Sequence, residues 1–245
     1  MSIDLNCDMG EGMDNDDKLM PLISSTNIAC GYHAGDEDAM KKTVESALQH
    51  QVAIGAHPGF ADKEFFGRRA LKLSAAEIYD LVIYQIEALK KITTAFHTSL
   101  HHVKPHGALY NLAAREVTVA HMVARAVHDA DPQLILYGLS GSFLVSEAAA
   151  IGLRTASEVF ADRTYQDSGQ LTPRSESNAL IDSEEKSIAQ VLQMIQEQKV
   201  TSIHSVIVPI VAETICIHGD GKQAVAFAKR IVATLKQQQV EIKPI

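Results

Sequence analysis

Four histidines stand where short apolar segments of the chain end. His33, His57, His106 and His218 each lie within two residues of a glycine or proline. An isolated histidine in such a place is usually a hydrogen-bonding loop residue, whereas four at successive strand ends indicate one shared site. Imidazole titrates near neutral pH and its ring nitrogens bind metals, so these residues suit proton transfer or metal ligation.

Carboxylates show a related pattern at the start of the chain. Residues 3–8 alternate between polar and apolar, which places Asp4, Asn6 and Asp8 on one face of a strand. The solvated face of an edge strand favours threonine, lysine or arginine over aspartate and asparagine. The alternation therefore predicts a polar cluster that faces inward.

The same residues fit either a metal site or acid–base chemistry without a metal. Histidines and a first-strand carboxylate can supply three ligands and leave one position open. No HExxH or His-x-His motif is present, so such ligands would come from distant segments. The candidate ligands are Asp8, His33, His57 and His106.

Basic side chains are concentrated in the same polar segments, which predicts an anionic group on the substrate. No GxxxxGK[ST] phosphate loop is present, because residues 219–222 (Gly-Asp-Gly-Lys) lack the upstream glycine and the following serine or threonine. The basic residues concerned are Arg68, Arg69, Lys104 and Arg163.

Short apolar strands alternate with amphipathic helices along the whole chain, which favours a parallel sheet with helices outside. The expected strands are residues 3–8, 25–29, 52–56, 101–104, 134–137, 155–159 and 214–217, and residues 203–211 fit either a strand or irregular chain. A closed seven-stranded (β/α) barrel is preferred to a doubly wound sheet because no Gly-rich dinucleotide turn is present. Either form places chemistry at the carboxyl ends of the strands.

Length and composition are typical of one α/β domain spanning residues 1–245. The net charge of −8 argues against nucleic acid or an anionic membrane as partner. The three cysteines form no CxxC pair and lie in or beside apolar runs, so buried, reduced thiols are expected. No signal peptide or membrane span is recognisable, and a cytoplasmic location is expected.

Seven motifs together resemble the LamB/YcsF family, in order from residue 3 to about residue 235. They are Asp4-Leu-Asn-Cys-Asp8-Met-Gly-Glu11, Asn27-Ile-Ala-Cys-Gly-Tyr-His33-Ala-Gly-Asp36, Gly55-Ala-His57-Pro, Phe66-Gly-Arg68, Val103-Lys-Pro-His106-Gly-Ala-Leu-Tyr110-Asn111, Glu158-Val-Phe-Ala-Asp162-Arg163 and His218-Gly-Asp220-Gly. One loop departs from the family pattern: it reads Tyr165-Gln-Asp167-Ser168-Gly169, with its acidic residue one place early.

The resemblance implies a TIM-like barrel similar to the glycoside hydrolase/deacetylase fold. It also implies cleavage of 5-oxo-L-proline to L-glutamate coupled to ATP hydrolysis, with ATP and Mg²⁺ as co-substrate. This chain would work beside two other 5-oxoprolinase subunits, B and C.

The resemblance also assigns site residues. The expected catalytic residues are Asp4, Asp8, His57, His106, Glu158 and Asp162. The expected substrate- or phosphate-binding residues are Asn6, His33, Arg68, Lys104, Tyr110, Arg163 and His218. Two other functional classes compete with this one: a metal-dependent deacetylase or amide hydrolase of carbohydrate-type substrates, and a non-catalytic binding subunit.

Overall fold

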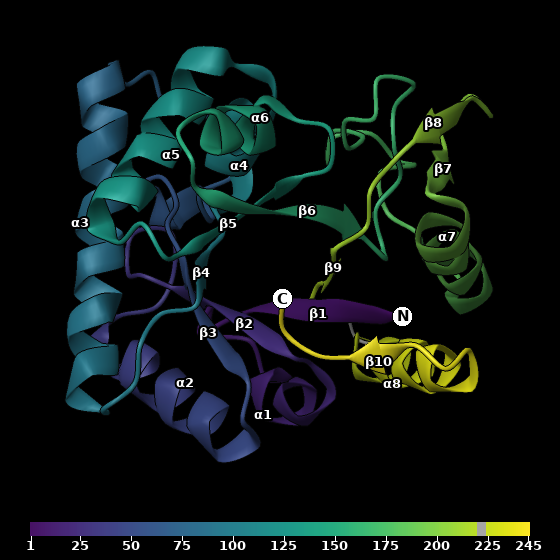
Figure 1. Cartoon of the computed structure of the whole chain (residues 1–245), viewed down its shortest axis with the longest axis horizontal. Helices are drawn as coiled ribbons and strands as arrows, with labels where there is room; N and C mark the ends of the chain where they lie inside the picture. Colours follow the sequence, from purple (N-terminus) through teal and green to yellow (C-terminus); the bar gives the residue numbers. More distant parts are fainter. Residues whose placement is uncertain (220–223) are drawn as a thin grey trace.

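Seven parallel strands close into a barrel in the computed structural model, which describes residues 1–219 and 224–245 (Figure 1). Strand β1 pairs with both β2 and β9, and this double pairing closes the sheet. The predicted seven-stranded barrel is confirmed. Its strands are β1 (Ser2–Met9), β2 (Ser25–Ala29), β3 (Ala53–His57), β4 (His102–Val103), β5 (Ile135–Leu139), β6 (Arg154–Phe160) and β9 (Thr214–Ile217).

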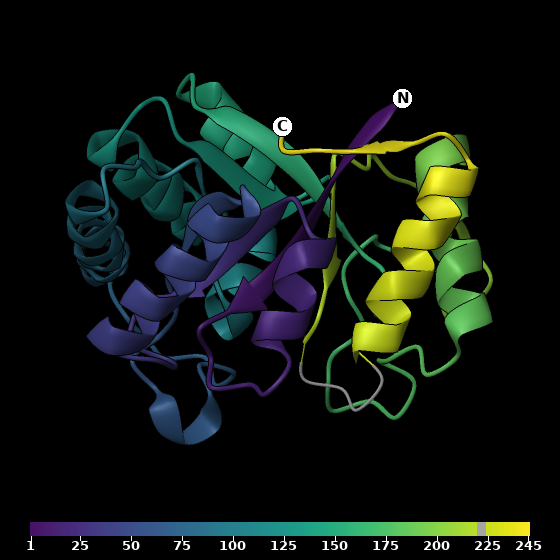
Figure 2. The ribbon, with the colours of Figure 1, turned by 90° about the horizontal axis from the view of Figure 1, so that it is seen from below.

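The helices lie outside the barrel, and α7 and α8 run side by side along one flank (Figure 2). Among the described residues, no helix combines the length and the apolar character needed to cross a membrane. The helices are α1 (Asp16–Leu19), η1 (Met20–Leu22), α2 (Glu37–His50), η2 (Lys63–Phe65), α3 (Ala75–Ala95), α4 (Gly107–Arg115), α5 (Val117–Ala130), α6 (Phe143–Ala150), α7 (Glu184–Glu197) and α8 (Ala224–Gln237).

Two helix starts follow directly from capping residues in the sequence. The Asp36 carboxylate accepts a hydrogen bond from the Ala39 amide at the start of α2, and Ser74 and Glu77 form a capping box at the start of α3. Two helices follow β4, because Glu116 adopts an extended backbone (φ −121°, ψ 108°) between α4 and α5.

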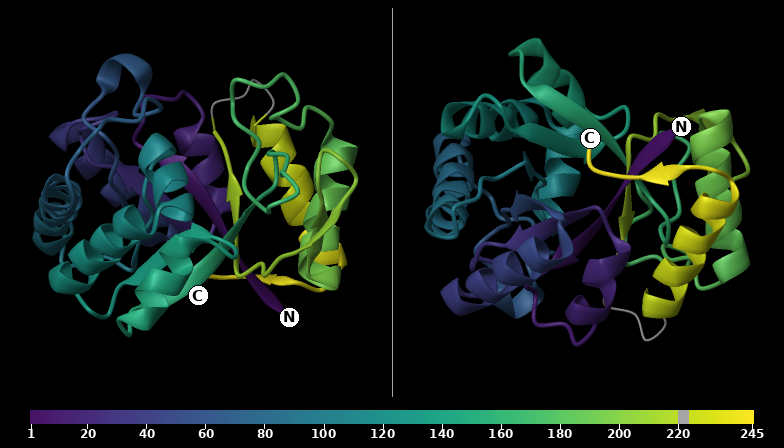
Figure 3. Two further views of the ribbon diagram at one scale, coloured as in Figure 1. Left: turned by 90° about the horizontal axis from the view of Figure 1, so that it is seen from above. Right: turned by 60° about the horizontal axis from the view of Figure 1, so that its bottom comes forward.

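Three further short strands lie outside the seven of the barrel. Residues 203–211, which fitted strand or irregular chain equally well, contribute β8 (Ile207–Pro209), which pairs antiparallel with β7 (Lys199–Thr201). Strand β10 (Glu241–Ile242) runs parallel to the first residues of β1, so the two chain ends lie close together (Figure 3). Two-residue strands carry no periodicity, which is why the sequence did not predict β10.

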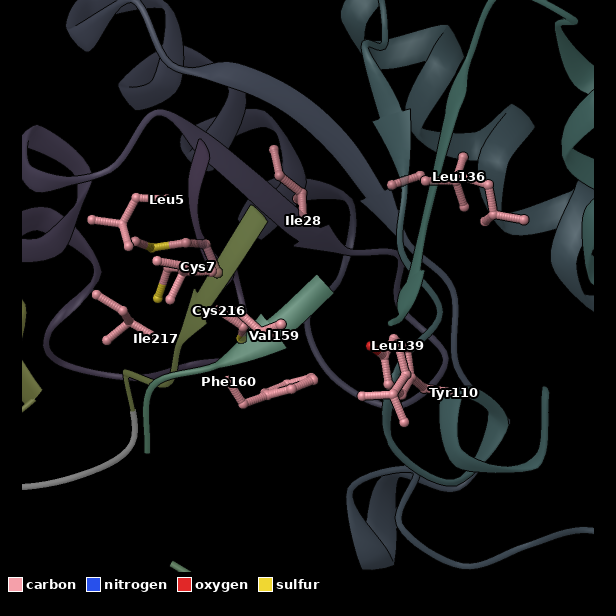
Figure 4. Close-up of a cluster of buried hydrophobic side chains, with 14 of the residues drawn as sticks. Leu5, Cys7, Ile28, Tyr110, Leu136, Leu139, Val159, Phe160, Cys216 and Ile217 are labelled. Atoms are coloured by element: carbon pink, nitrogen blue, oxygen red, sulfur yellow. The ribbon is translucent and has the colours of Figure 1, made fainter. Parts of the chain in front are cut away.

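The two faces of the barrel strands differ in polarity. Leu5, Cys7 and Ile217 gather beside β1 and β9 in the apolar layer (Figure 4). The alternate residues point into the barrel, where the Asn27 side-chain amide donates to both Asn6 Oδ1 (2.8 Å) and Asp8 Oδ1 (2.9 Å). The inward polar face predicted for residues 3–8 is confirmed. All three cysteines are buried free thiols, as expected.

Asp4 lies at the opposite end of the barrel from Asp8. Its carboxylate accepts hydrogen bonds from the hydroxyls of Ser24 (2.6 Å), Ser25 (2.7 Å) and Thr214 (2.6 Å). Asp4 is 1% exposed, and the three hydroxyl donors satisfy its carboxylate. These contacts join three strands, which is a structural role.

His102 is fully buried inside the barrel. Gly55 makes room for it, because a Cβ at that position would lie only 2.1 Å from His102 Nε2. His102 Nε2–H donates to Asn27 Oδ1 (2.8 Å), and the ring stacks on Tyr137. Burial, together with the nearby His101 and Lys104, holds the pKa of His102 well below its usual value.

This histidine predicts a loss of stability in mild acid. Below about pH 6.5 the unfolded chain binds a proton that the buried His102 does not, so the free energy of unfolding falls as the pH falls. Each such group contributes up to about 1.4 kcal/mol per pH unit. Urea unfolding between pH 5 and 8 should show a shallower pH dependence for His102→Gln than for the wild type. His128→Gln, at a side chain that is 42% exposed, should keep the wild-type dependence of the unfolding free energy on pH. An equal pH dependence for the wild type and both variants would contradict the prediction.

Candidate active site

A cleft of about 370 Å³ opens at the carboxyl ends of the barrel strands, where chemistry was expected. Residues at the ends of β1, β3, β4 and β9 line it, together with α4 and the loop between β6 and α7. The lining includes Asp8, Glu11, His57, Arg68, Lys104, His106, Tyr110, Asn111, Arg115, Phe160, Arg163, Arg174 and His218.

Three of the four predicted histidines meet in one cluster. The rings of His33 and His106 stack with centroids 3.8 Å apart, and His57 meets His106 edge-on at 4.8 Å. Gly67 permits this packing at a backbone φ of +62°, because a Cβ there would lie 2.8 Å from His33 Cβ and 3.0 Å from His106 Cδ2. The Phe66-Gly67 turn of the sequence is therefore part of the site.

Backbone carbonyls determine which ring nitrogens in this cluster carry hydrogen. His57 Nδ1–H donates to the Lys104 carbonyl (2.7 Å), and His106 Nε2–H donates to the Phe66 carbonyl (2.9 Å). The remaining nitrogens, His57 Nε2 and His106 Nδ1, face each other at 2.9 Å. If both rings were neutral, each of these two nitrogens would carry a lone pair, and two lone pairs at this distance repel each other. A shared proton or a cation is therefore required between the two nitrogens.

Two carboxylates supply the negative charge beside this point. Asp8 Oδ2 lies 3.3 Å from His57 Nε2, and Glu11 Oε1 lies 3.2 Å from His106 Nδ1 and 3.0 Å from His33 Nε2. Burial lowers the pKa of His57, but Asp8 and Glu11 outweigh it and raise that pKa above its usual value. Burial and the neighbouring His57 hold the pKa of His106 well below the usual value. A single shared proton therefore belongs mainly to His57.

Glu11 was absent from the predicted site residues although its motif was recognised. The available signal was its position between Gly10 and Gly12, directly after the first strand. A carboxylate in a glycine turn at a strand end has the reach and freedom to fold back over the barrel.

The cluster also fits a divalent metal ion. One ligand atom from each of Glu11, His33, His57 and His106 lies within 4.8 Å of all the others. Ligands bound about 2.0–2.2 Å from one ion lie roughly 3 to 3.6 Å from each other, close to the 2.9–3.2 Å found for the nearest pairs. Asp8 belongs to a second such group, with Cys216 and His218.

Lys104 lies beneath the cleft and is neutralised by two acidic side chains. Its ammonium contacts Glu158 Oε1 (2.8 Å) and Asp8 Oδ1 (3.0 Å), and it donates to Asn6 Oδ1 (3.2 Å). Although burial lowers its pKa, Asp8 and the neighbouring Cys216 and Glu158 raise the Lys104 pKa well above the usual value. These contacts fix the orientation of Asp8 and leave Lys104 little capacity to hold a substrate anion.

A second acid–base pair comes from the ends of β6 and β9. His218 Nδ1 contacts both carboxylate oxygens of Asp162, at 2.8 and 2.9 Å. Burial raises the pKa of Asp162, but His218 outweighs it and leaves that pKa below its usual value. Because Nδ1–H donates to the carboxylate, His218 Nε2 is left as an acceptor on a ring that lines the cleft.

Other predicted residues have different surroundings. Arg163 is 4% exposed and donates from Nε to the Ala179 carbonyl and from Nη2 to the Thr172 carbonyl, so it holds the loop after β6. The Arg68 guanidinium lies over the Phe66 ring, 5.1 Å from its centroid.

The acidic residue of the altered loop turns away from the cleft. Asp167 accepts from Ser202 Oγ and His204 Nδ1 and is not among the residues that line the cleft. Asp220 and Gly221 of the last motif, and Lys222 after them, lie outside the described residues.

Comparison with known proteins decides the family. The model of the LamB/YcsF family matches residues 3–245. The chain belongs to the LamB/YcsF family. It is 54% identical to the A subunit of 5-oxoprolinase from Tolumonas auensis, over 98% of each chain. It is 41% identical to the lactam utilization protein of Thermus thermophilus, whose crystal structure matches over 100% of both chains with a TM-score of 0.93.

The LamB/YcsF barrel is also similar to more distant enzymes. A family 4 carbohydrate esterase from Streptomyces lividans is 14% identical, with a TM-score of 0.51 over 100% of this chain and 92% of the esterase. At this identity the likeness concerns the fold alone, and it agrees with the predicted deacetylase-like barrel.

Proposed function

We propose that this LamB/YcsF protein opens the cyclic amide of 5-oxo-L-proline by hydrolysis to L-glutamate, as one component of an ATP-consuming assembly. The names of its relatives support the substrate and the place in an assembly. The observation that carries the chemistry is the 2.9 Å approach of His57 Nε2 to His106 Nδ1 beside Asp8 and Glu11.

In this proposal His57 and His106 handle one proton during hydrolysis. Glu11 takes a proton from water as the water oxygen bonds to the lactam carbonyl carbon. The carbon–nitrogen bond then breaks, and the proton that His57 Nε2 already holds passes to the ring nitrogen, which leaves as the amine of glutamate. The proton on Glu11 then returns to the histidine pair and restores the starting state. Asp8 stabilises the protonated His57, and His218 Nε2 orients the substrate by accepting its N–H.

The need for ATP follows from the substrate. A five-membered lactam is unstrained and is a poor electrophile, so its hydrolysis is close to balanced. Phosphorylation of the lactam oxygen by ATP would release ADP and make the lactam carbon a better electrophile. Water adds to that carbon, the carbon–nitrogen bond breaks to leave an acyl phosphate, and a second water hydrolyses the acyl phosphate to glutamate and phosphate. We propose that ATP, with Mg²⁺, is used in this way by the assembly of this chain with the B and C subunits.

Omission of each component in turn tests this proposal. The complete assembly should convert 5-oxo-L-proline and ATP to glutamate and ADP, and removal of this chain should stop glutamate formation. Glutamate formation at an unchanged rate without this chain would reject it as the component that opens the ring. If the chain only bound substrate for a partner, replacing His57 would leave turnover intact.

A metal-dependent amide hydrolase is the second candidate, favoured by the four converging donors Glu11, His33, His57 and His106. A divalent ion there would act as a Lewis acid on the amide carbonyl. Elemental analysis of the purified protein should then find about one ion per chain, removable by a chelator. The double variant His33→Gln, His106→Gln should bind none, while His128→Gln should bind as the wild type does. A metal-free protein that is fully active in chelator would exclude this candidate.

A further inference from the structure

The cleft continues away from the histidines between α4 and the loop that follows β6. This second lobe has a volume of about 320 Å³ and shares part of its lining with the first. Three arginines line both lobes, whereas the second lobe has one acidic residue, Glu176, in its lining. The shared arginines are Arg115, Arg163 and Arg174.

The charge of Arg174 acts on Asp162, but no ion pair joins Arg174 to any of the described residues. No hydrogen bond or ion pair joins it to the part of the chain that the structure describes, and its side chain is exposed at the cleft. Arg115 has only a long approach to Glu116, with Nε and Oε1 3.9 Å apart and its side chain 51% exposed. Such a contact contributes little to stability, so both guanidinium groups are available to a ligand.

Arg163 and Arg174 repel each other. Burial, followed by the charge of Arg174, lowers the pKa of Arg163 to about 10. Asp162, whose charge acts on both arginines, is already held by His218. In a chain whose net charge is −8, this local excess of positive charge beside a cleft is compensated when an anion binds.

We propose that Arg115, Arg163 and Arg174 form a subsite for an anionic oxygen group, a carboxylate or a phosphate, on the molecule whose amide reaches the histidine cluster. A guanidinium presents paired N–H donors that match the two oxygens of such a group. The identity of the substrate rests on the proposed function, but the subsite itself does not. Arg163 is fixed to the loop, so Arg174 and Arg115 are the groups that select the anion.

Isothermal titration of the full chain tests this subsite with three probes. These are 5-oxo-L-proline, its neutral analogue 2-pyrrolidinone, and inorganic phosphate. The variant is Arg174→Gln, and the matched control is Arg154→Gln, which removes the same charge from an exposed residue at the start of β6, the opposite end of the barrel. Since Arg174 is exposed and unpaired in the described structure, neither variant should change the melting temperature.

The wild type should bind 5-oxo-L-proline at least tenfold more tightly than 2-pyrrolidinone. Arg174→Gln should lose about tenfold or more in affinity for the probe that the wild type binds, and Arg154→Gln should lose none. Loss for 5-oxo-L-proline identifies a carboxylate subsite, and loss for phosphate alone identifies a phosphate subsite. Equal affinities of wild type and Arg174→Gln, or no binding of either anion to the wild type, would overturn the subsite.

The same variants separate this inference from the proposed function. If the complete assembly makes glutamate and Arg174→Gln changes neither its KM for 5-oxo-L-proline nor the affinity of the chain for phosphate, the subsite is wrong and the function stands. If anion binding depends on Arg174 but the assembly makes no glutamate, the subsite stands and the function is wrong.

Discussion

Replacing His57 with glutamine should lower kcat for glutamate formation by about 10²- to 10⁴-fold, the usual contribution of a general acid–base group. His57 carries the proton that the cluster shares, and its Nδ1–H bond to the Lys104 carbonyl aims Nε2 at His106. Glutamine cannot take up that proton. The rate is measured as glutamate released by the complete assembly at saturating 5-oxo-L-proline and ATP.

Replacing His106 should lower kcat to a similar extent, because its Nδ1 accepts the hydrogen bond that holds the shared proton at His57 Nε2. The assembly should still form with His106→Gln, and the double variant with His57→Gln should be about as slow as the slower single variant, because residues that act as one unit are not additive. His128→Gln is the matched control on the outer helix α5. Near-normal turnover by either single variant would remove the cluster from the chemistry.

Replacing Lys104 with methionine should destabilise the fold by about 3–5 kcal/mol, the cost of leaving buried charge without its partner. Lys104 is 2% exposed and lies between Asp8 and Glu158, so its removal leaves two carboxylates uncompensated. Urea unfolding at pH 7.5 measures the loss. Activity should fall as well, because Asp8 would no longer be held beside His57.

A second substitution distinguishes the ion pair from simple packing. Adding Glu158→Gln to Lys104→Met removes one of the stranded carboxylates and should restore part of the lost stability. Lys91→Met, at an exposed position of α3, should change stability by less than about 0.5 kcal/mol. If Lys104→Met unfolds at the wild-type urea concentration, the buried network does not depend on the lysine.

Periodicity and strand ends were sufficient to predict the barrel and the edge that carries the site. The alternation of Asp4, Asn6 and Asp8 correctly predicted an inward face. It did not show that Asp4 and Asp8 lie at different ends, although four residues of strand span roughly 13 Å at about 3.3 Å per residue. Asp4 therefore contacts serine and threonine hydroxyls near the amino end of β1, and Asp8 contacts a histidine near its carboxyl end.

The roles of the basic residues depended on tertiary structure. Sequence alone indicated Arg163 and Lys104 as anion holders. In the structure Lys104 pairs with two carboxylates, and Arg163 donates to two loop carbonyls while still lining the cleft. Arg115 and Arg174 reach the cleft because helix α4 and the loop after β6 fold over it. No local sequence pattern predicts that either arginine lines the cleft, because only the folded barrel brings them together.

The most direct test of the central claim counts glutamate and ADP in the same reaction. The complete assembly is compared with one in which this chain carries both His57→Gln and His106→Gln. If this chain opens the ring, the wild type should form one glutamate per ADP, and the double variant should form glutamate at least about 10²-fold more slowly. Glutamate formed by the double variant at the wild-type rate would show that the ring is opened elsewhere.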